Sequence, residues 1–125
     1  YDGLNRVELE ACLAQLLAQL RAADTAPRTA AVAYLAPLAA ISAGAYGRVI
    51  ERVVDADRRF RNDASGVSIT RFPPGLVGAL DKASKGSARP AQSPLVMEHL
   101  WMVAPRPGSQ SHPLTETRIA ALREL

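Results

Sequence analysis

The sequence predicts a single, mainly α-helical domain. Its 125 residues are 48% hydrophobic and 22% charged, which is typical of a globular chain with one modest core. Apolar residues recur at helical spacing in several segments, and prolines and glycines separate these segments. One apolar run, Leu95–Val103, could form a strand, and a short helix fits it equally well. We therefore expect residues 1–125 to form one mainly α domain, of the α+β type, with a small β-element.

The first predicted helix runs from about residue 5 to residue 23. Asn5 can cap its start, and Glu8 lies three residues later, where its side chain can bond back to the cap amide. Asp24, Thr25 and Pro27 are predicted to end it. Its leucines are spaced as one helical stripe, which we expect to face the core: Leu9, Leu13, Leu16 and Leu20, with Leu17 widening it.

An uncharged, alanine-rich segment follows, from Ala30 to Gly47. Its length approaches that of a membrane span, but alanine contributes little transfer free energy, and Pro37 and Gly44 interrupt the run. Two interpretations stay open here: a helix of a soluble domain, which these features favour, or the remnant of a membrane-dipping segment.

Three more helices are predicted along the rest of the chain. They cover residues 48–70, 74–84 and 113–125, and the last two open with a proline at a first-turn position. The charged run 55–63 is expected to form a solvated face of the first of them. In the closing helix, Ile119 and Leu122 are expected to face the core.

Charge and cysteine content restrict the function only weakly. The formal net charge is +3, so attraction to acidic partners is slight. Cys12 is the single cysteine; it cannot form an internal disulfide, we expect it to be a small buried group, and a reducing compartment is the default. Because the chain starts at Tyr1, we expect a processed product or an excised domain.

The first predicted helix carries a family resemblance. The stretch LNRVELEACLAQLLAQLRAAD resembles the first core helix of the HtpX-type membrane-associated zinc metallopeptidases, the gluzincin family that also includes the CAAX prenyl-protein proteases. In that family the stretch reads roughly L-[DN]-R-x-E-L-x-A-V-L-A-H-E-x-x-H. The zinc-binding H-E-x-x-H of the family falls on Gln15-Leu16-Leu17-Ala18-Gln19 of this chain.

Two later segments resemble the same family in the same order. RRFRNDASGVSITRFPPGLVGALDKAS is similar to its second signature, with Arg59 at the third zinc-ligand position and Asn62 where an alanine is usual. HLWMVAP and SHPLTETRIAALREL are similar to its closing segments. The resemblance implies a zincin-like core of packed helices. It also implies a transmembrane hairpin between the first two core helices, where this chain has only a short alanine-rich connection, residues 25–47.

The resemblance implies that the zinc site has been lost. Active members use two histidines and a glutamate as ligands and a second glutamate as general base. This chain has Gln15, Gln19 and Arg59 at the ligand positions and Leu16 at the base, so we expect no metal, no other cofactor and no catalysis. We expect the glutamines to bond each other, Asp63 or Arg59. Without the resemblance they would be ordinary solvent-facing helix residues.

Three further residues match positions with roles in the family. Asp63 corresponds to a partner of a zinc-bound histidine, and His112 and Arg118 correspond to groups beside the substrate carbonyl. The resemblance thus implies a vestigial cleft formed by these three side chains. The competing interpretation of His112 and Arg118 is a loop histidine and a helix-surface arginine with no remaining chemistry.

Our first functional hypothesis is a catalytically inactive, HtpX-like pseudopeptidase domain. It would bind a polypeptide or a partner subunit, an active homologue being one candidate, with the polypeptide as an extended strand along a sheet edge. The resemblance places such a chain in the cytoplasm or at the inner face of the membrane, and leaves membrane association open.

Two alternatives come from other classes of function. One is a residual peptidase, with ligands from another chain or with a metal-free activity that uses His112 and Arg118. The other is a small-molecule or anion-binding module that uses Arg58, Arg59 and Arg61, for which a solvated cluster is the competing interpretation. Nucleic acid is not expected, because only Phe60 could stack beside these arginines.

Overall fold

The chain folds into helices joined by short connections. The computed structural model describes residues 3–23, 25–53, 57–86, 100–104 and 112–125, and no strand forms within these ranges. The mainly α prediction is confirmed. Of the apolar run predicted as strand or short helix, residues 95–99 lie outside the described residues, and residues 100–103 form no strand.

Helix α1, Arg6–Arg21, begins where the sequence predicts and for the predicted reason. The Asn5 side chain accepts a hydrogen bond of 2.9 Å from the Glu8 backbone N–H, and the Glu8 carboxylate accepts one of 2.7 Å from the Asn5 backbone N–H. This capping box satisfies two of the amides that a helix start leaves without partners. Thr25, predicted to help end α1, is instead the first residue of the next helix.

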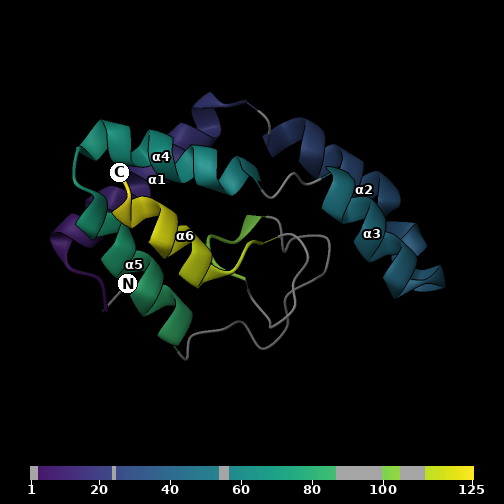
Figure 1. The fold of residues 1–125 in the computed structure, drawn as a ribbon. Helices are drawn as coiled ribbons and strands as arrows, with labels where there is room; N and C mark the ends of the chain where they lie inside the picture. The colour runs from purple at the N-terminus through teal and green to yellow at the C-terminus, as the bar shows by residue number, and fades with distance from the viewer. Residues whose placement is uncertain (1–2, 24, 54–56, 87–99, 105–111) are drawn as a thin grey trace.

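The alanine-rich segment forms a helical hairpin. Helix α2, Thr25–Ile41, contains Pro37, and helix α3, Ala43–Val53, follows after Ser42. The two pack against each other around Val32 and Tyr46 and lie to one side of the other helices (Figure 1). Among the described residues, no helix has both the length and the apolar character needed to cross a membrane.

The single helix predicted over residues 48–70 is wrong, because two helices share that range. Helix α3 ends at Val53, and α4, Asp57–Thr70, begins after three residues that lie outside the described part. Helix α5, Pro73–Lys85, starts at the proline pair as predicted, and α6, Thr115–Arg123, starts two residues after Pro113. The first two core helices, α1 and α4, pack against each other as expected.

Helices α1, α4, α5 and α6 enclose the main hydrophobic core. Their buried apolar residues meet there, and Ile119 packs against them: Ala11, Val67, Leu76, Leu80 and Leu122. The prediction that Ile119 and Leu122 face the core is confirmed. Figure 1 shows α6 lying across the group formed by α1, α4 and α5. The core therefore holds α6 against α4, which matters for the site described below.

The predicted orientation of α1 is wrong. The helix buries its alanines and glutamines and exposes its leucine stripe, with exposed fractions of 38–68% for Leu9, Leu13, Leu16, Leu17 and Leu20. The physical reason is the close approach of the neighbouring helices. A Cβ on Gly66 of α4 would lie 2.8 Å from the Cα of Gln15, and one on Gly75 of α5 would lie 3.3 Å from the Cβ of Ala11. At such distances alanine fits the interface and leucine does not.

Candidate functional site: a buried guanidinium cluster

Helices α1 and α4 bring together the positions that the family resemblance assigns to the zinc site. Gln15 is 0% exposed and Gln19 is 7% exposed on the buried face of α1, so the alternative that they are solvent-facing is wrong. Arg59 and Asp63 lie on the buried face of α4, the helix against which α1 packs. Leu16 lies on the outer side of α1 and is 45% exposed.

Two of the three clustered arginines are buried. Arg58 and Arg59 are each 1% exposed, so a solvated cluster is the wrong description for them, whereas Arg61 is exposed. Burial, together with the nearby charges of Arg118 and Arg58, lowers the pKa of Arg59 to about 9. Arg59 therefore still carries its positive charge at neutral pH.

Asp63 pairs with α6 through a two-pronged ion pair. The Nε and Nη2 atoms of Arg118 donate to the two carboxylate oxygens at 2.7 and 2.8 Å, and both side chains are buried. Arg118 also donates from Nη1 to the backbone carbonyl of Met102 at 2.6 Å. The competing interpretation, that Arg118 is a helix-surface arginine, is wrong, because its side chain is buried. Its planar guanidinium joins α4, α6 and the segment 100–104 at one point.

His112 lies against Arg59 at the start of the closing segment. Its Nε2 is 2.9 Å from Nη2 of Arg59 and 2.7 Å from the carbonyl oxygen of Trp101. Burial, together with the Arg59 charge, lowers the pKa of His112 to about 3, so the ring is neutral at physiological pH. A neutral ring nitrogen either donates or accepts: Nε2–H bonds the Trp101 carbonyl, or a bare Nε2 accepts from Arg59.

Gln15 does not form the expected polar network. Neither its Oε1 nor its Nε2 has a hydrogen-bond partner, although both atoms are buried. The two oxygens of Asp63 accept hydrogen bonds from the guanidinium of Arg118. The tight contact between Gln15 and the backbone of Gly66 places this side chain inside the α1–α4 interface. Its amide is therefore a buried polar group that other interactions must offset.

The side chains at these positions do not fit a zinc ion. Amide oxygens are poor zinc ligands, a guanidinium has no lone pair to donate, and the charge of Arg59 opposes that of a dication. Within the ranges that the structure describes, no group of three or more histidine, cysteine, aspartate or glutamate side chains is arranged to hold a metal ion.

Sequence reasoning missed several contacts of this site. The carbonyls of Trp101 and Met102, which receive His112 and Arg118, belong to a segment where the sequence pattern left strand and helix open. It also missed the ion pair of 2.9 Å between Lys82 of α5 and Glu8 of α1, which holds the pKa of Glu8 below its usual value. No spacing rule links residues this far apart, so the sequence carried no signal for these pairs.

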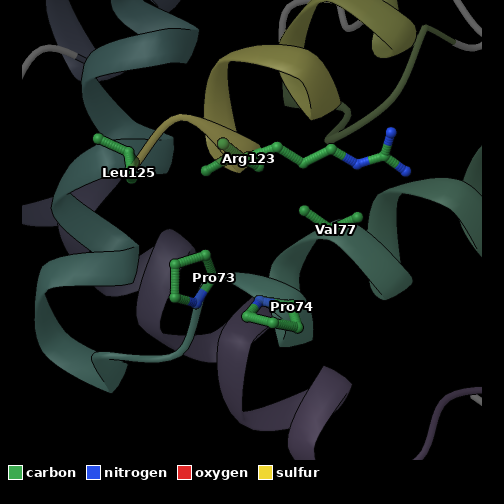
Figure 2. Close-up of a pocket in the computed structure, with 6 residues that line it drawn as sticks. Pro73, Pro74, Val77, Arg123 and Leu125 are labelled. Carbon is green, nitrogen blue, oxygen red and sulfur yellow. The ribbon is translucent and has the colours of Figure 1, made fainter.

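A separate apolar cavity of about 340 Å³ lies between the start of α5 and the end of α6. Figure 2 shows Pro73 and Pro74 on one side of it, with Arg123 and Leu125 across from them. Val77 and Leu122 complete its lining. None of these residues belongs to the guanidinium cluster.

Comparison with known proteins finds relatives that carry the HtpX name, in agreement with the family resemblance noted in the sequence. The "Protease HtpX homolog" of Tropheryma whipplei, in strains Twist and TW08/27, is 37% identical over 98 residues, which cover 73% of this chain and 31% of the relative. The protein of the same name from Desulforapulum autotrophicum is 32% identical over 100 residues, or 74% of this chain and 30% of the relative. The chain is HtpX-like in sequence.

The similarity covers only part of the length of these relatives. The chain spans about a third of the length of these HtpX homologues. No family model matches it, and no solved structure matches it. The HtpX-like part nevertheless covers about three quarters of the chain, so the resemblance noted in three segments holds over most of the sequence.

Proposed function

We propose that this chain is a catalytically inactive, HtpX-like domain that acts by binding a polypeptide or protein partner. The first half of this proposal rests on the burial of Arg59 on α4. The resemblance puts Arg59 at the third ligand position, and its guanidinium is 1% exposed and held at 2.9 Å from His112. A fixed cation thus takes the place of a ligand.

The other substitutions act in the same direction. A zinc peptidase needs a base that accepts a proton from the attacking water, and Leu16 has no group that can accept one. Gln15 and Gln19 retain the length of a histidine side chain but not its ring nitrogen. The remaining residues of the family's cleft, Asp63 and Arg118, bond each other and support packing between α4 and α6.

The leucine face of α1, namely Leu9, Leu13, Leu16, Leu17 and Leu20, supports the second half of the proposal. Five large apolar side chains on one face of one helix are each 38–68% exposed. Contiguous apolar surface of this kind marks contact with a partner. The apolar face of a partner helix matches its geometry, since an exposed helical stripe pairs with another by interdigitation.

The first test measures metal. Protein purified without chelator would be analysed by plasma mass spectrometry and then titrated with zinc while its melting temperature is followed. We expect no stoichiometric metal and no zinc-dependent rise in melting temperature. One tightly bound metal ion per chain, with peptide hydrolysis that a chelator abolishes, would overturn the inactive assignment.

A second test rebuilds the family's site. The quadruple variant Gln15→His/Leu16→Glu/Gln19→His/Arg59→Glu is expected to bind one zinc ion per chain, because it restores three ligands and removes the opposing charge. The matched control, Gln15→His/Gln19→His, keeps Arg59 and is expected to bind zinc far more weakly. Failure of a folded quadruple variant to bind zinc would count against the alignment on which the assignment rests.

A third test addresses the partner surface. Binding to fluorescein-labelled, reduced and carboxymethylated α-lactalbumin would be followed by fluorescence anisotropy. We expect the variant Leu13→Gln/Leu17→Gln to weaken binding at least tenfold, and the control Leu114→Gln/Leu125→Gln, which changes exposed leucines elsewhere, to leave it within about twofold. Equal binding by all three proteins would remove the leucine face from the proposal.

A further inference from the structure

A second polar site lies on the far end of the α1–α4 interface. A cavity of about 430 Å³ opens between the end of α1 and α4, along α4 from Arg58 to Ile69. From α1 it is lined by Ala18, Arg21 and Ala22, and from α4 by Arg58, Arg61, Asn62, Ser65, Ser68 and Ile69. Arg59, Asp63 and Arg118 are not among the lining residues, so this cavity shares only Arg58 with the guanidinium cluster.

The polar lining of this cavity is rich in donors. Three arginines reach it, together with an amide and two hydroxyl groups, and no carboxylate is among the lining residues that the structure describes. Arg58 is 1% exposed and is therefore fixed in place, whereas Arg21 and Arg61 are exposed and lie at the rim. A wall that combines one buried guanidinium with two exposed ones is suited to an oxyanion.

Asn62 provides an independent indication of a ligand. Its side chain is 4% exposed and lines the cavity, and its Nδ2 has no hydrogen-bond partner. Buried donors without a partner are rare in native proteins, because each one loses its hydrogen bonds to water without a replacement. An acceptor supplied from outside the chain would satisfy this amide.

The start of α4 favours negative charge in the same place. Arg58 and Arg61 lie in the first turns of a helix that begins at Asp57. The positive end of the helix dipole adds to their charge within that turn. The dipole and the arginines act together on whatever occupies the cavity.

We propose that this cavity binds the phosphate group of a small phosphate ester. A phosphate dianion can accept from several guanidinium groups and from the Asn62 amide at once, which exceeds what one carboxylate can accept. The cavity is larger than inorganic phosphate needs, and its apolar residues, Ala18, Ala22 and Ile69, can contact the organic part of the ligand. The phosphate could come from a free ester or from a lipid headgroup.

The test is calorimetric titration at constant ionic strength with phenyl phosphate, inorganic phosphate and acetate. We expect saturable binding of phenyl phosphate, weaker binding of inorganic phosphate and still weaker binding of acetate. Arg21→Gln/Arg61→Gln should raise the dissociation constant for phenyl phosphate at least about tenfold. The control Arg48→Gln/Arg52→Gln, which changes the net charge equally at exposed positions on α3, should change it less than about twofold.

Asn62→Ala separates a binding role from a structural one. Because the Nδ2 atom of Asn62 has no partner to lose, we expect an unchanged or higher urea midpoint in the free protein, with a dissociation constant for phenyl phosphate raised about fivefold or more. Sedimentation with vesicles of phosphatidic acid, compared with phosphatidylcholine alone, distinguishes a lipid headgroup from a free ester.

Absence of saturable phosphate binding in both assays overturns the proposal. An equal loss of affinity in the cavity variant and in the α3 control also overturns it, because the effect would then be one of net charge. Neither result bears on the metal test above, since that test depends on other residues.

Discussion

The buried ion pair between Asp63 and Arg118 gives a prediction that depends on no assignment of function. We consider three variants: Asp63→Leu, Arg118→Met and the two combined. Each single change leaves one buried charge without its two hydrogen bonds of 2.7 and 2.8 Å. The double change removes both charges and fills the space with apolar groups of similar size.

The magnitude follows from burial and from the neighbouring charges. Breaking a buried ion pair by removing one partner destabilises a protein by about 3–5 kcal/mol. Asp63→Leu should lie near the top of that range, because it leaves Arg118 beside the like charges of Arg59 and Arg58. Arg118→Met should lie near the bottom, about 3 kcal/mol, because the charge of Arg59 still favours the ionised carboxylate.

The double variant is the decisive comparison. We expect it to be no less stable than the worse single variant, so that the coupling free energy is at least as large as the smaller single loss, about 3 kcal/mol. The measurement is urea denaturation followed by far-UV circular dichroism at neutral pH, with equal denaturant slopes as the check on two-state behaviour. Additive losses, equal to the sum of the two single changes within about 0.5 kcal/mol, would refute the reasoning.

Three shorter predictions follow from other residues. The pKa of His112 is about 3 in the folded protein against an ordinary 6.5, so the unfolded chain binds more protons between these pH values. The free energy of unfolding should therefore fall as pH drops from 6.5 to 3, with a slope of up to about 1.4 kcal/mol per pH unit. Urea titrations at several pH values would measure this slope, and His112→Asn should reduce it. Gly66→Ala should destabilise by about 1–3 kcal/mol, because its Cβ would lie 2.8 Å from the α1 backbone, whereas Gly44→Ala, with open space around it, should not; a lower urea midpoint for both would contradict this. Leu17→Gln should change the free energy of unfolding by less than about 0.5 kcal/mol, and Leu80→Ala, in the core, by about 2–5 kcal/mol, which thermal denaturation would check.

Local sequence signals predicted the starts of helices well. The Asn5–Glu8 capping box and the Pro73–Pro74 pair each act within one turn, so the information needed lies in adjacent residues. The break at Ser42 was not predicted. Its hydroxyl accepts from the Ala45 backbone N–H at 3.2 Å, which caps the start of a new helix between the two interruptions of the run, Pro37 and Gly44.

The short distance between α1 and its neighbours α4 and α5 determines which face of α1 is buried. The periodicity of apolar residues does not encode this distance. The leucine stripe has the spacing of a core face, and an isolated amphipathic helix would bury it. The buried side instead carries Ala11, Ala14 and Ala18, and two glycines approach this helix closely, Gly75 at Ala11 and Gly66 at Gln15. A hydrophobicity pattern predicts the buried face of a helix from the transfer free energy of its side chains. In this interface the size of the side chains decides instead, because only small ones fit between closely packed helices.

The burial of Arg59 and Asp63 could not be predicted from the local sequence either, because it depends on contacts between distant residues. A run of arginines and aspartates such as residues 55–63 usually forms a solvated face. Burial of such charges requires partners that offset the free energy of desolvation, and here those partners lie far along the chain. Asp63 finds its partner 55 residues later, and Arg59 finds His112 53 residues later. Both partners lie in or beside α6, so the closing segment and the charged face of α4 require each other. The family resemblance pointed to these positions together, while the pairing itself, Asp63 with Arg118 and Arg59 with His112, is visible only once α6 is packed on the core.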